Sequence, residues 1–310
     1  MISFRFHLVS LTAVFLALGI GIAVGASVVD RATVDLLEDR LAGVENRLDA
    51  TDTENAELRR QLAEWATFTE QARDQAVAGR LDGVPVLVIG VQGIDRGPVE
   101  AFRQTLNAAD ADLVGTVWFT SKMRLDKDED AVALADLLGV APRSGDVVRR
   151  NLVDLLVSEL TGQTATGLVA RLRDAAFVEF EAPAGAPVDP AALATGSTRF
   201  VVVSGGRAEV PNEQLAVPLA TQLAEGARAR VLAVEAGEDV SGAAPPEHAG
   251  VFVGPLRSGP AAPLLSSVDN LEDWRGRFSA VFALRDLGSA KVGHYGSGPG
   301  AVRLVPETAG

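Results

Sequence analysis

Cysteine is absent from the 310-residue sequence, and the other side chains that bind soft metals are scarce, with three His and two Met. The lack of Cys excludes disulfide bridges, thiolate metal sites and cysteine nucleophiles, and it leaves the redox compartment open. Cu(I) is usually held by clustered Cys, Met or His. Only Met1 and His7 lie within ten residues of each other, so no copper motif is evident in the sequence.

Basic residues are also few, with 28 Lys and Arg against 41 Asp and Glu and a formal net charge of −13. A nucleic-acid-binding surface needs clustered Lys and Arg, so this balance argues against nucleic acid as a partner. The motifs GxxxxGK[ST], GxSxG and HExxH are missing from the sequence. No pair of acids has a spacing that indicates general acid–base work, so we expect a protein that is not an enzyme.

One long uncharged run is present, from Leu8 to Val29. A helix of this length spans roughly 33 Å, enough for a bilayer core, whereas the apolar part of a signal peptide is about 7–15 residues long. We expect a transmembrane helix over residues 8–29, with cleavage near Ser27 or burial in a core as alternatives. Arg5 precedes the run, so the positive-inside rule predicts a single-pass cell-membrane protein with residues 1–7 in the cytoplasm and the remainder extracytoplasmic.

Small residues recur at every fourth position of this run, at Ala13, Ala17, Gly21 and Gly25. They share one helix face and would let two helices pack closely. Ala and Gly are common in any membrane helix, so the stripe alone leaves both readings open. The segment that follows favours association.

After the uncharged run, apolar residues recur at alternating spacings of three and four, as at the a and d positions of a coiled coil. Asn55 falls at an a position, where it is best satisfied by the same Asn of a parallel, in-register partner. The sequence therefore predicts a homodimer interface at these positions: Val34, Leu37, Leu41, Val44, Leu48, Thr51, Asn55, Leu58, Leu62 and Trp65.

The charges that flank this seam agree with the same register. Each exposed ion pair contributes little alone, yet three matching pairs favour the dimer over a single amphipathic helix packed on the domain. Gly83 and Pro85 end the helix, which gives a coiled coil over residues 30–82. Its rod would be roughly 70 Å long from Val34 to Gly79. The facing g–e′ pairs are Arg40 with Glu45, Arg47 with Asp52, and Glu54 with Arg59.

Residues 84–310 alternate short β-branched runs with helix-like segments. This alternation predicts an extracytoplasmic α/β domain with a mostly parallel sheet and helices on both faces, the layering of flavodoxin-like folds. The expected strands are 84–91, 112–119, 199–206 and 229–237, and the expected helices are 98–109, 128–138, 212–227 and 271–287, with 145–181 mostly helical. By composition, 183–192 and 236–250 are exposed loops.

A doubly wound sheet offers a ligand crevice at the carboxyl ends of its strands. The loops expected there are 90–95 and 204–207. Neither carries a phosphate-binding fingerprint, so we interpret both glycine clusters as structural turns. Ser204 follows a strand, as a nucleophile could, but no nearby His would activate it.

The densest local feature is GHYGSGPG at residues 293–300, where Gly and Pro force tight bends and bring the backbone close to its neighbours. Gly293, His294, Tyr295 and Gly296 are therefore a candidate pocket or partner loop. The alternative is a structural turn before a final strand over residues 301–305. If a metal binds at all, the candidate ligands are His248 and His294.

Several short segments resemble the actinobacterial copper-transporter family, often called MctB-like. They are the opening MISFRFHLVSL, the FLALG of the uncharged run, the VDN at residues 268–270 and the GHYG at residues 293–296. The resemblance implies a cell-envelope protein of copper transport or copper homeostasis, in some members an outer-membrane channel. Other relatives are linked to cell division through a cytoplasmic partner protein.

The residues themselves favour an anchored, dimeric coiled-coil scaffold that presents an α/β interaction domain to envelope enzymes or cell-division proteins. A single apolar helix is a poor pore, and the soft metal ligands are few. A copper transport or homeostasis component is the alternative. No cofactor is expected from the residues, and copper enters by resemblance only.

Overall fold

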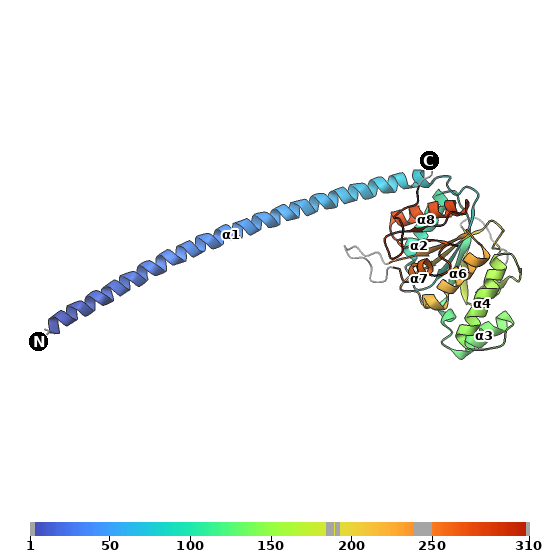
Figure 1. Cartoon of the computed structure of the whole chain (residues 1–310), viewed down its shortest axis with the longest axis horizontal. Coiled ribbons are helices and arrows are strands. Elements are labelled where there is room, and N and C mark those ends of the chain that lie inside the picture. The colour runs from blue at the N-terminus through green and yellow to red at the C-terminus, as the bar shows by residue number, and fades with distance from the viewer. Residues whose placement is uncertain (1–3, 184–188, 190–192, 238–249, 308–310) are drawn as a thin grey trace. The chain divides into compact units, whose positions relative to one another are not determined.

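The structure is a computed structural model. It describes residues 4–183, 189, 193–237 and 250–307. Within helix 4–77 only the backbone is described at residues 26–36, 38–39, 66, 68–71 and 73–74. The chain divides into two compact units, Met1–Glu70 and Gln71–Gly310 (Figure 1). Each unit is described by itself.

The first unit is one continuous helix. Helix α1 covers Phe4–Val77 without a break between the uncharged run and the heptad segment. The stretch Phe4–Gly25 is long and apolar enough to cross a membrane. The helix ends close to the predicted position, because Gly79 and Gly83 adopt positive φ angles of 69° and 64° in the turn that follows.

The second unit is built on a seven-stranded sheet with the order β3-β2-β1-β4-β5-β6-β7. All neighbouring strands are parallel except β2 and β3, which are antiparallel. The confirmed α/β fold therefore has one antiparallel edge. The strands are β1 Pro85–Val91, β2 Asp112–Phe119, β3 Val178–Glu181, β4 Arg199–Ser204, β5 Val231–Glu235, β6 Ser266–Val268 and β7 His294–Tyr295.

Helices cover both faces of this sheet, and two hydrophobic clusters result. Helices α2 and α8 pack on one face together with Val77 from the end of α1, while α3 to α7 supply the cluster on the other face. Alternate residues of β1 point into opposite clusters, as a strand buried on both faces requires. The helices are α2 Arg96–Ala108, α3 Asp128–Leu138, α4 Gly145–Leu160, α5 Leu168–Asp174, α6 Ala216–Gly226, α7 Val253–Ser258 and α8 Trp274–Leu287, with 3₁₀ turns η1 Ser121–Arg124 and η2 Asn212–Gln214.

Three parts of the sequence reading need correction. The segment 145–181 is mostly helical, as expected, but it ends in the edge strand β3, which the sequence analysis missed because VEFE is only four residues long. The reading also missed the short elements α7 and β6. The expected strand over residues 301–305 is reduced to one bridge, from Arg303 to Tyr295. Most residues of the two predicted loops, 184–188, 190–192 and 238–249, lie outside the described part.

Candidate functional site

The carboxyl ends of β1 and β4 mark the switch point of the sheet, where a ligand crevice is expected. Here the loops that follow the two strands contact each other through their backbones. The amide of Glu209 donates to the carbonyl of Gln92 over 2.7 Å, and a Cβ at Gly93 would overlap the carbonyl of Arg207. The loops after the two strands therefore pack on each other, in agreement with their interpretation as structural turns.

Ser204, at the end of β4, is buried and holds a turn together. Its hydroxyl lies 2.5 Å from the amide oxygen of Asn212, and the Asn212 amide donates to the carbonyl of Gly205 over 3.1 Å. An acceptor that is an amide oxygen cannot take the serine proton as a general base would. The arrangement gives Ser204 a structural role.

Glu235, at the end of β5, is 2% exposed and caps the start of α7. Its Oε1 accepts from the amides of Gly250 (2.7 Å) and Val251 (3.2 Å), and its Oε2 from those of Phe252 (2.9 Å) and Val253 (3.0 Å). Burial raises the pKa of Glu235, and the four amide donors oppose that shift. Such a group of amides suits an anion, and the chain fills it with its own carboxylate.

The most connected polar cluster of the domain, here called the Arg257 cluster, consists of Arg257, Ser267, Asp269 and His294. Arg257 on α7 donates from Nη1 to Asp269 Oδ2 over 2.7 Å, and both side chains are 1% exposed. Its Nε donates to Ser267 Oγ over 2.8 Å, and its Nη2 donates to the carbonyl of Tyr295 over 2.7 Å. One guanidinium thus joins α7, β6 and β7.

The glycine-rich loop wraps the carboxylate of this cluster. The amides of Ser297 and Gly298 donate to Asp269 Oδ1 (2.9 Å) and Oδ2 (2.8 Å). Gly296 has a φ of 122°, and a Cβ there would overlap the Asp269 carboxylate. The VDN and GHYG segments, far apart in the sequence, therefore meet at one buried ion pair, and Gly at position 296 is required by that close approach.

His294 is half-buried, and its ring is hydrogen-bonded to Ser267. Its Nδ1 lies 2.9 Å from Ser267 Oγ. Burial lowers the pKa of His294, the nearby Arg257 guanidinium lowers it further, and a hydrogen bond with the backbone of Ala262 opposes these effects. Nδ1 is therefore available to a metal only if its hydrogen bond to Ser267 breaks.

The other candidate ligand, His248, lies outside the described residues. Across the parts that are described, no group of three or more His, Cys, Asp or Glu is placed to hold a metal ion. Gly293 and Tyr295 take part in the same packed turn as His294 and Gly296, since the Gly293 amide donates to Ser266 Oγ over 3.1 Å. The candidate loop is thus built into the sheet edge.

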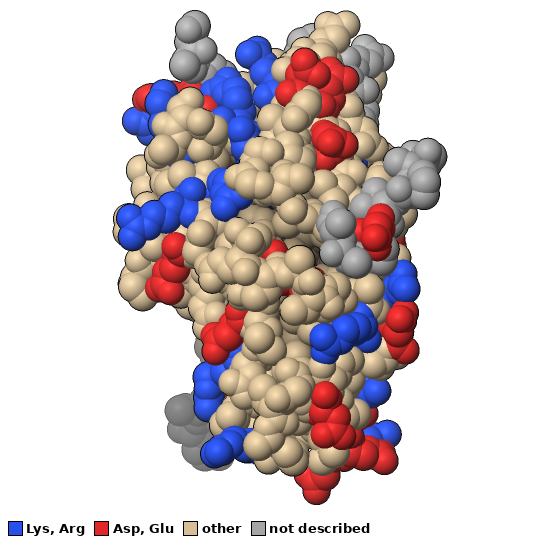
Figure 2. Space-filling model, turned by 90° about the vertical axis from the view of Figure 1, so that its right-hand side faces the viewer, with Lys and Arg blue, Asp and Glu red and all other residues tan. Residues whose placement is uncertain are grey.

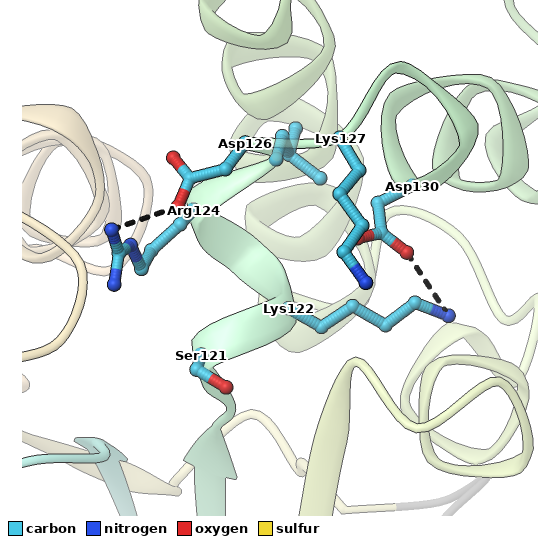
Figure 3. Close-up of a pocket in the computed structure, with 7 residues that line it drawn as sticks. Ser121, Lys122, Arg124, Asp126, Lys127 and Asp130 are labelled. Atoms are coloured by element: carbon cyan, nitrogen blue, oxygen red, sulfur yellow. Dashed lines mark ion pairs between the residues drawn. The ribbon is translucent and has the colours of Figure 1, made fainter.

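A polar hollow of about 400 Å³ lies at η1 and the start of α3, a feature that the sequence did not indicate (Figure 3). Two of its three cations pair with its acids: Lys122 lies 3.7 Å from Asp130, and Arg124 lies 2.8 Å from Asp126, while Lys127 forms no ion pair with a described residue. Acidic and basic side chains are also mixed over the face of the domain that Figure 2 shows. Neither feature marks the site of a highly charged ligand.

The seam side chains of α1 whose positions are described are open to solvent in the single chain, from 51% exposure at Val44 to 69% at Leu62. Asn55 Nδ2 donates to the carbonyl of Thr51 over 3.0 Å. Arg60 pairs with Glu57 and Glu64 on the opposite side of the helix. None of the six charges at the g and e positions forms an ion pair with another described residue, so the apolar stripe and its flanks remain available.

Sequence reasoning missed Arg257 and Ser267. Arg257 lies in a short apolar segment, VFVGPLRS, which has no helical periodicity long enough to recognise. An isolated Arg beside Val, Pro and Leu is a signal of a buried charge, which needs a partner, but only the fold shows that this partner is Asp269.

Taken together, these features define a protein with one candidate membrane helix continuous with a heptad-bearing helix, followed by an α/β domain whose sheet edge is closed by a glycine-rich loop. A model of the family described as copper transport outer membrane protein, MctB, matches residues 1–306. The chain belongs to this family, and the resemblance drawn from its two ends is confirmed.

Curated relatives match over nearly their full length. The copper transporter MctB of Mycobacterium tuberculosis is 26% identical over 324 residues, which cover 98% of this chain and 99% of that protein, and the protein of the same name from Mycobacterium bovis gives the same values. Copper transporter MctB of Mycobacterium leprae is 28% identical over 335 residues, covering 99% of this chain and 100% of that protein. The similarity includes both units.

Proposed function

We propose that this protein is a membrane-anchored component of copper transport or copper homeostasis. Its relatives carry the name copper transporter. The observation that carries the proposal is the family match over residues 1–306, which takes in the helix as well as the domain. Phe4–Gly25 is the proposed anchor.

Within that role the chain acts as a parallel dimer that presents the α/β domain, and we assign the domain no catalytic function. Support comes from the exposed stripe of α1, since Leu residues left in water along one helix face gain most by facing the same stripe of a second copy. The opposite charges at g and e favour a parallel arrangement. Arg5 before the anchor favours a cytoplasmic N-terminus and an extracytoplasmic domain.

The copper role is tested by deleting the gene in its host and measuring cellular copper by mass spectrometry at several external copper concentrations. We expect the deletion to change the copper content, and the full-length chain to restore it. A chain that lacks residues 4–25 should not restore it. Unchanged copper content and unchanged copper tolerance in the deletion strain would contradict the proposal.

Whether the chain itself binds copper is tested by titrating the detergent-solubilised full-length protein with Cu(I) and with Cu(II). Binding tighter than micromolar that disappears in a variant with His248→Ala and His294→Asn would make the chain itself a copper carrier. If no such binding is found but the deletion strain has an altered copper content, the copper is bound by a partner protein that the scaffold holds.

A second candidate function is an envelope or cell-division scaffold without a copper role, with a cytoplasmic cell-division protein or envelope enzymes as partners. It is favoured by one observation: His294, the described candidate ligand, is committed to hydrogen bonds within the domain. A deletion strain with normal copper content but with daughter cells that fail to separate would support this candidate.

Topology is tested with a reporter fused after Gly310 and by sequencing the N-terminus of the mature protein. The proposal requires a reporter that is active outside the cytoplasm and a mature chain that keeps Met1 or Ile2. A mature N-terminus near Ser27 would show cleavage and remove the anchor.

A further inference from the structure

The end of helix α1 belongs to the core of the domain. Val77 and Leu81 are fully buried, and both lie in the hydrophobic cluster that α2 and α8 form on one face of the sheet. Val77 is the last residue of the helix, and Leu81 follows in the turn that leads to β1. Both residues fall within the second unit, Gln71–Gly310. The domain therefore buries the end of the same helix that carries the heptad pattern.

Hydrogen bonds hold this turn in place as well. The amide of Leu81 donates to the carbonyl of Ala109 over 2.9 Å, and the amide of Gly79 donates to Asp110 Oδ2 over 3.0 Å. Both acceptors directly follow α2. The end of α1 is thus attached to α2 by hydrogen bonds in addition to its apolar packing.

The heptad register, continued past Trp65, runs into this packed region. It places Ala72 at a d position and Ala76 at an a position, where a coiled coil would seat both against a partner helix. Both alanines are half-buried in the single chain, whereas the other alanines of α1 whose side chains are described are exposed. Val77, beside Ala76, is buried in the domain. The domain therefore covers the seam positions of the last two turns.

The apolar pattern changes phase at the same place. Upstream, the large apolar residues Leu58, Leu62 and Trp65 occupy a and d positions. At the end of the helix the large apolar residue is Val77, at a b position, which lies roughly 100° around the helix from the a position before it. Alanine is a poor knob in a coiled coil, because its single methyl group buries little apolar surface. The last two turns thus offer little to a partner helix, while they supply a buried side chain to the domain.

We propose that α1 changes partner after Glu70, where the second unit begins. Upstream, its seam packs on a second copy of the chain. In its last two turns the helix packs on its own domain, and the contact between the two helices ends before Ala72. The first half rests on the proposed parallel dimer, whereas the second half needs only contacts within the second unit. Each domain is then attached to its own helix by packed side chains, and the two helices can separate beyond the seam without unfolding either domain.

Single cysteines in this cysteine-free chain test where the contact between the helices ends. Leu62→Cys and Ala76→Cys each introduce a thiol at an a position, and the full-length variants are oxidised in lipid nanodiscs. Leu62→Cys should form the crosslinked dimer efficiently. Ala76→Cys should crosslink at least about tenfold more slowly, because its thiol meets its counterpart only when the packing on the domain opens.

Glutamate substitutions test the contact with the domain without reference to the dimer. Ala76→Glu places a charge where the domain covers the helix, and it should lower the midpoint of thermal unfolding of the domain by at least about 2 °C. Ala63→Glu is the matched control, because Ala63 is exposed, and it should leave that midpoint unchanged. Neither substitution should change the crosslinking of Leu62→Cys when the two are combined.

Two results would overturn the proposal. One is an Ala76→Cys variant that crosslinks as fast as Leu62→Cys while its domain unfolds at the temperature of the parent protein. The other is an Ala76→Glu variant that weakens self-association and leaves domain unfolding unchanged. If Leu62→Cys itself does not crosslink, the parallel dimer and the first half of the proposal fail, and the effect of Ala76→Glu on the domain still decides the second half. If Ala76→Cys does not fold, Ala72→Cys takes its place.

Discussion

The two units of this protein treat their apolar side chains in opposite ways. In the second unit Leu87 of β1 is completely buried between sheet and helices, whereas Leu62 of α1 is 69% exposed. The domain satisfies its hydrophobic pattern within one chain. The apolar side chains of the helix stay exposed in the single chain. We propose that a bilayer covers residues 4–25 and that a second helix covers the seam of residues 37–65.

The largest effect in this comparison is expected from the buried ion pair of the domain. Arg257→Leu would leave Asp269 charged, buried and without its cation, and should lower the free energy of unfolding of the domain by about 3–5 kcal/mol. Thermal or denaturant unfolding of the full-length protein measures this. Arg173→Leu is the control: Arg173 pairs with Asp174 at the surface, and its loss should cost less than about 1 kcal/mol. Equal losses in the two variants would contradict the account.

A pair of Leu substitutions compares the units directly. Leu87→Ala should lower the unfolding free energy of the domain by about 2–5 kcal/mol, because it leaves a cavity in a packed core. Leu62→Ala should leave domain unfolding unchanged and instead weaken self-association. Denaturant unfolding followed by circular dichroism and sedimentation equilibrium in detergent separate the two effects. A domain that loses stability in Leu62→Ala would show that the seam packs on the domain.

Within the second unit, the length of an element and the signals at its ends explain how well the sequence predicted it. Helix α3 was predicted with its bounds, 128–138, because three acids open it and Gly139 ends it in the left-handed region. The segments around β3, α7 and β6 were not predicted, since three to six residues carry too little periodicity to separate strand from helix.

Part of the candidate site could be predicted from the sequence. The glycines of the GHYG segment were evident in the sequence, but the reason for them is the carboxylate of Asp269, which directly follows another strand, β6. Arg257, which joins these elements, is marked in the sequence only as an isolated Arg among apolar residues, and that signal does not identify its partner. Long-range pairing of buried charges is a property of the fold, and spacing along one sequence does not show it.

Replacing Asn55 by Leu sharpens the prediction for the helix. An apolar a position buries more surface and leaves no amide to satisfy, so self-association should strengthen. The polar match that disfavours trimers and antiparallel pairs is then lost, so the oligomeric state should broaden. Analytical ultracentrifugation measures both. A variant that remains strictly dimeric and gains no stability would argue that Asn55 does not face a partner.

The smallest effect is expected from charge reversal beside the seam. Changing Arg40 and Arg47 to Glu places acids opposite Glu45 and Asp52 and should weaken the dimer by about 1 kcal/mol, because these pairs are exposed. High salt should reduce the difference by screening. Sedimentation equilibrium at two ionic strengths measures it. A loss that salt does not change would point to misfolding and not to charge.

The most direct measurement for the parallel dimer is disulfide crosslinking of an Asn55→Cys variant in membranes, since the natural chain has no Cys. The account predicts efficient crosslinking under oxidising conditions, because in-register pairing puts the two introduced thiols side by side. Arg60→Cys is the matched control on the other side of the helix and should crosslink poorly. An Asn55→Cys protein with a normally folded domain whose thiols stay free under the same conditions would contradict the parallel dimer.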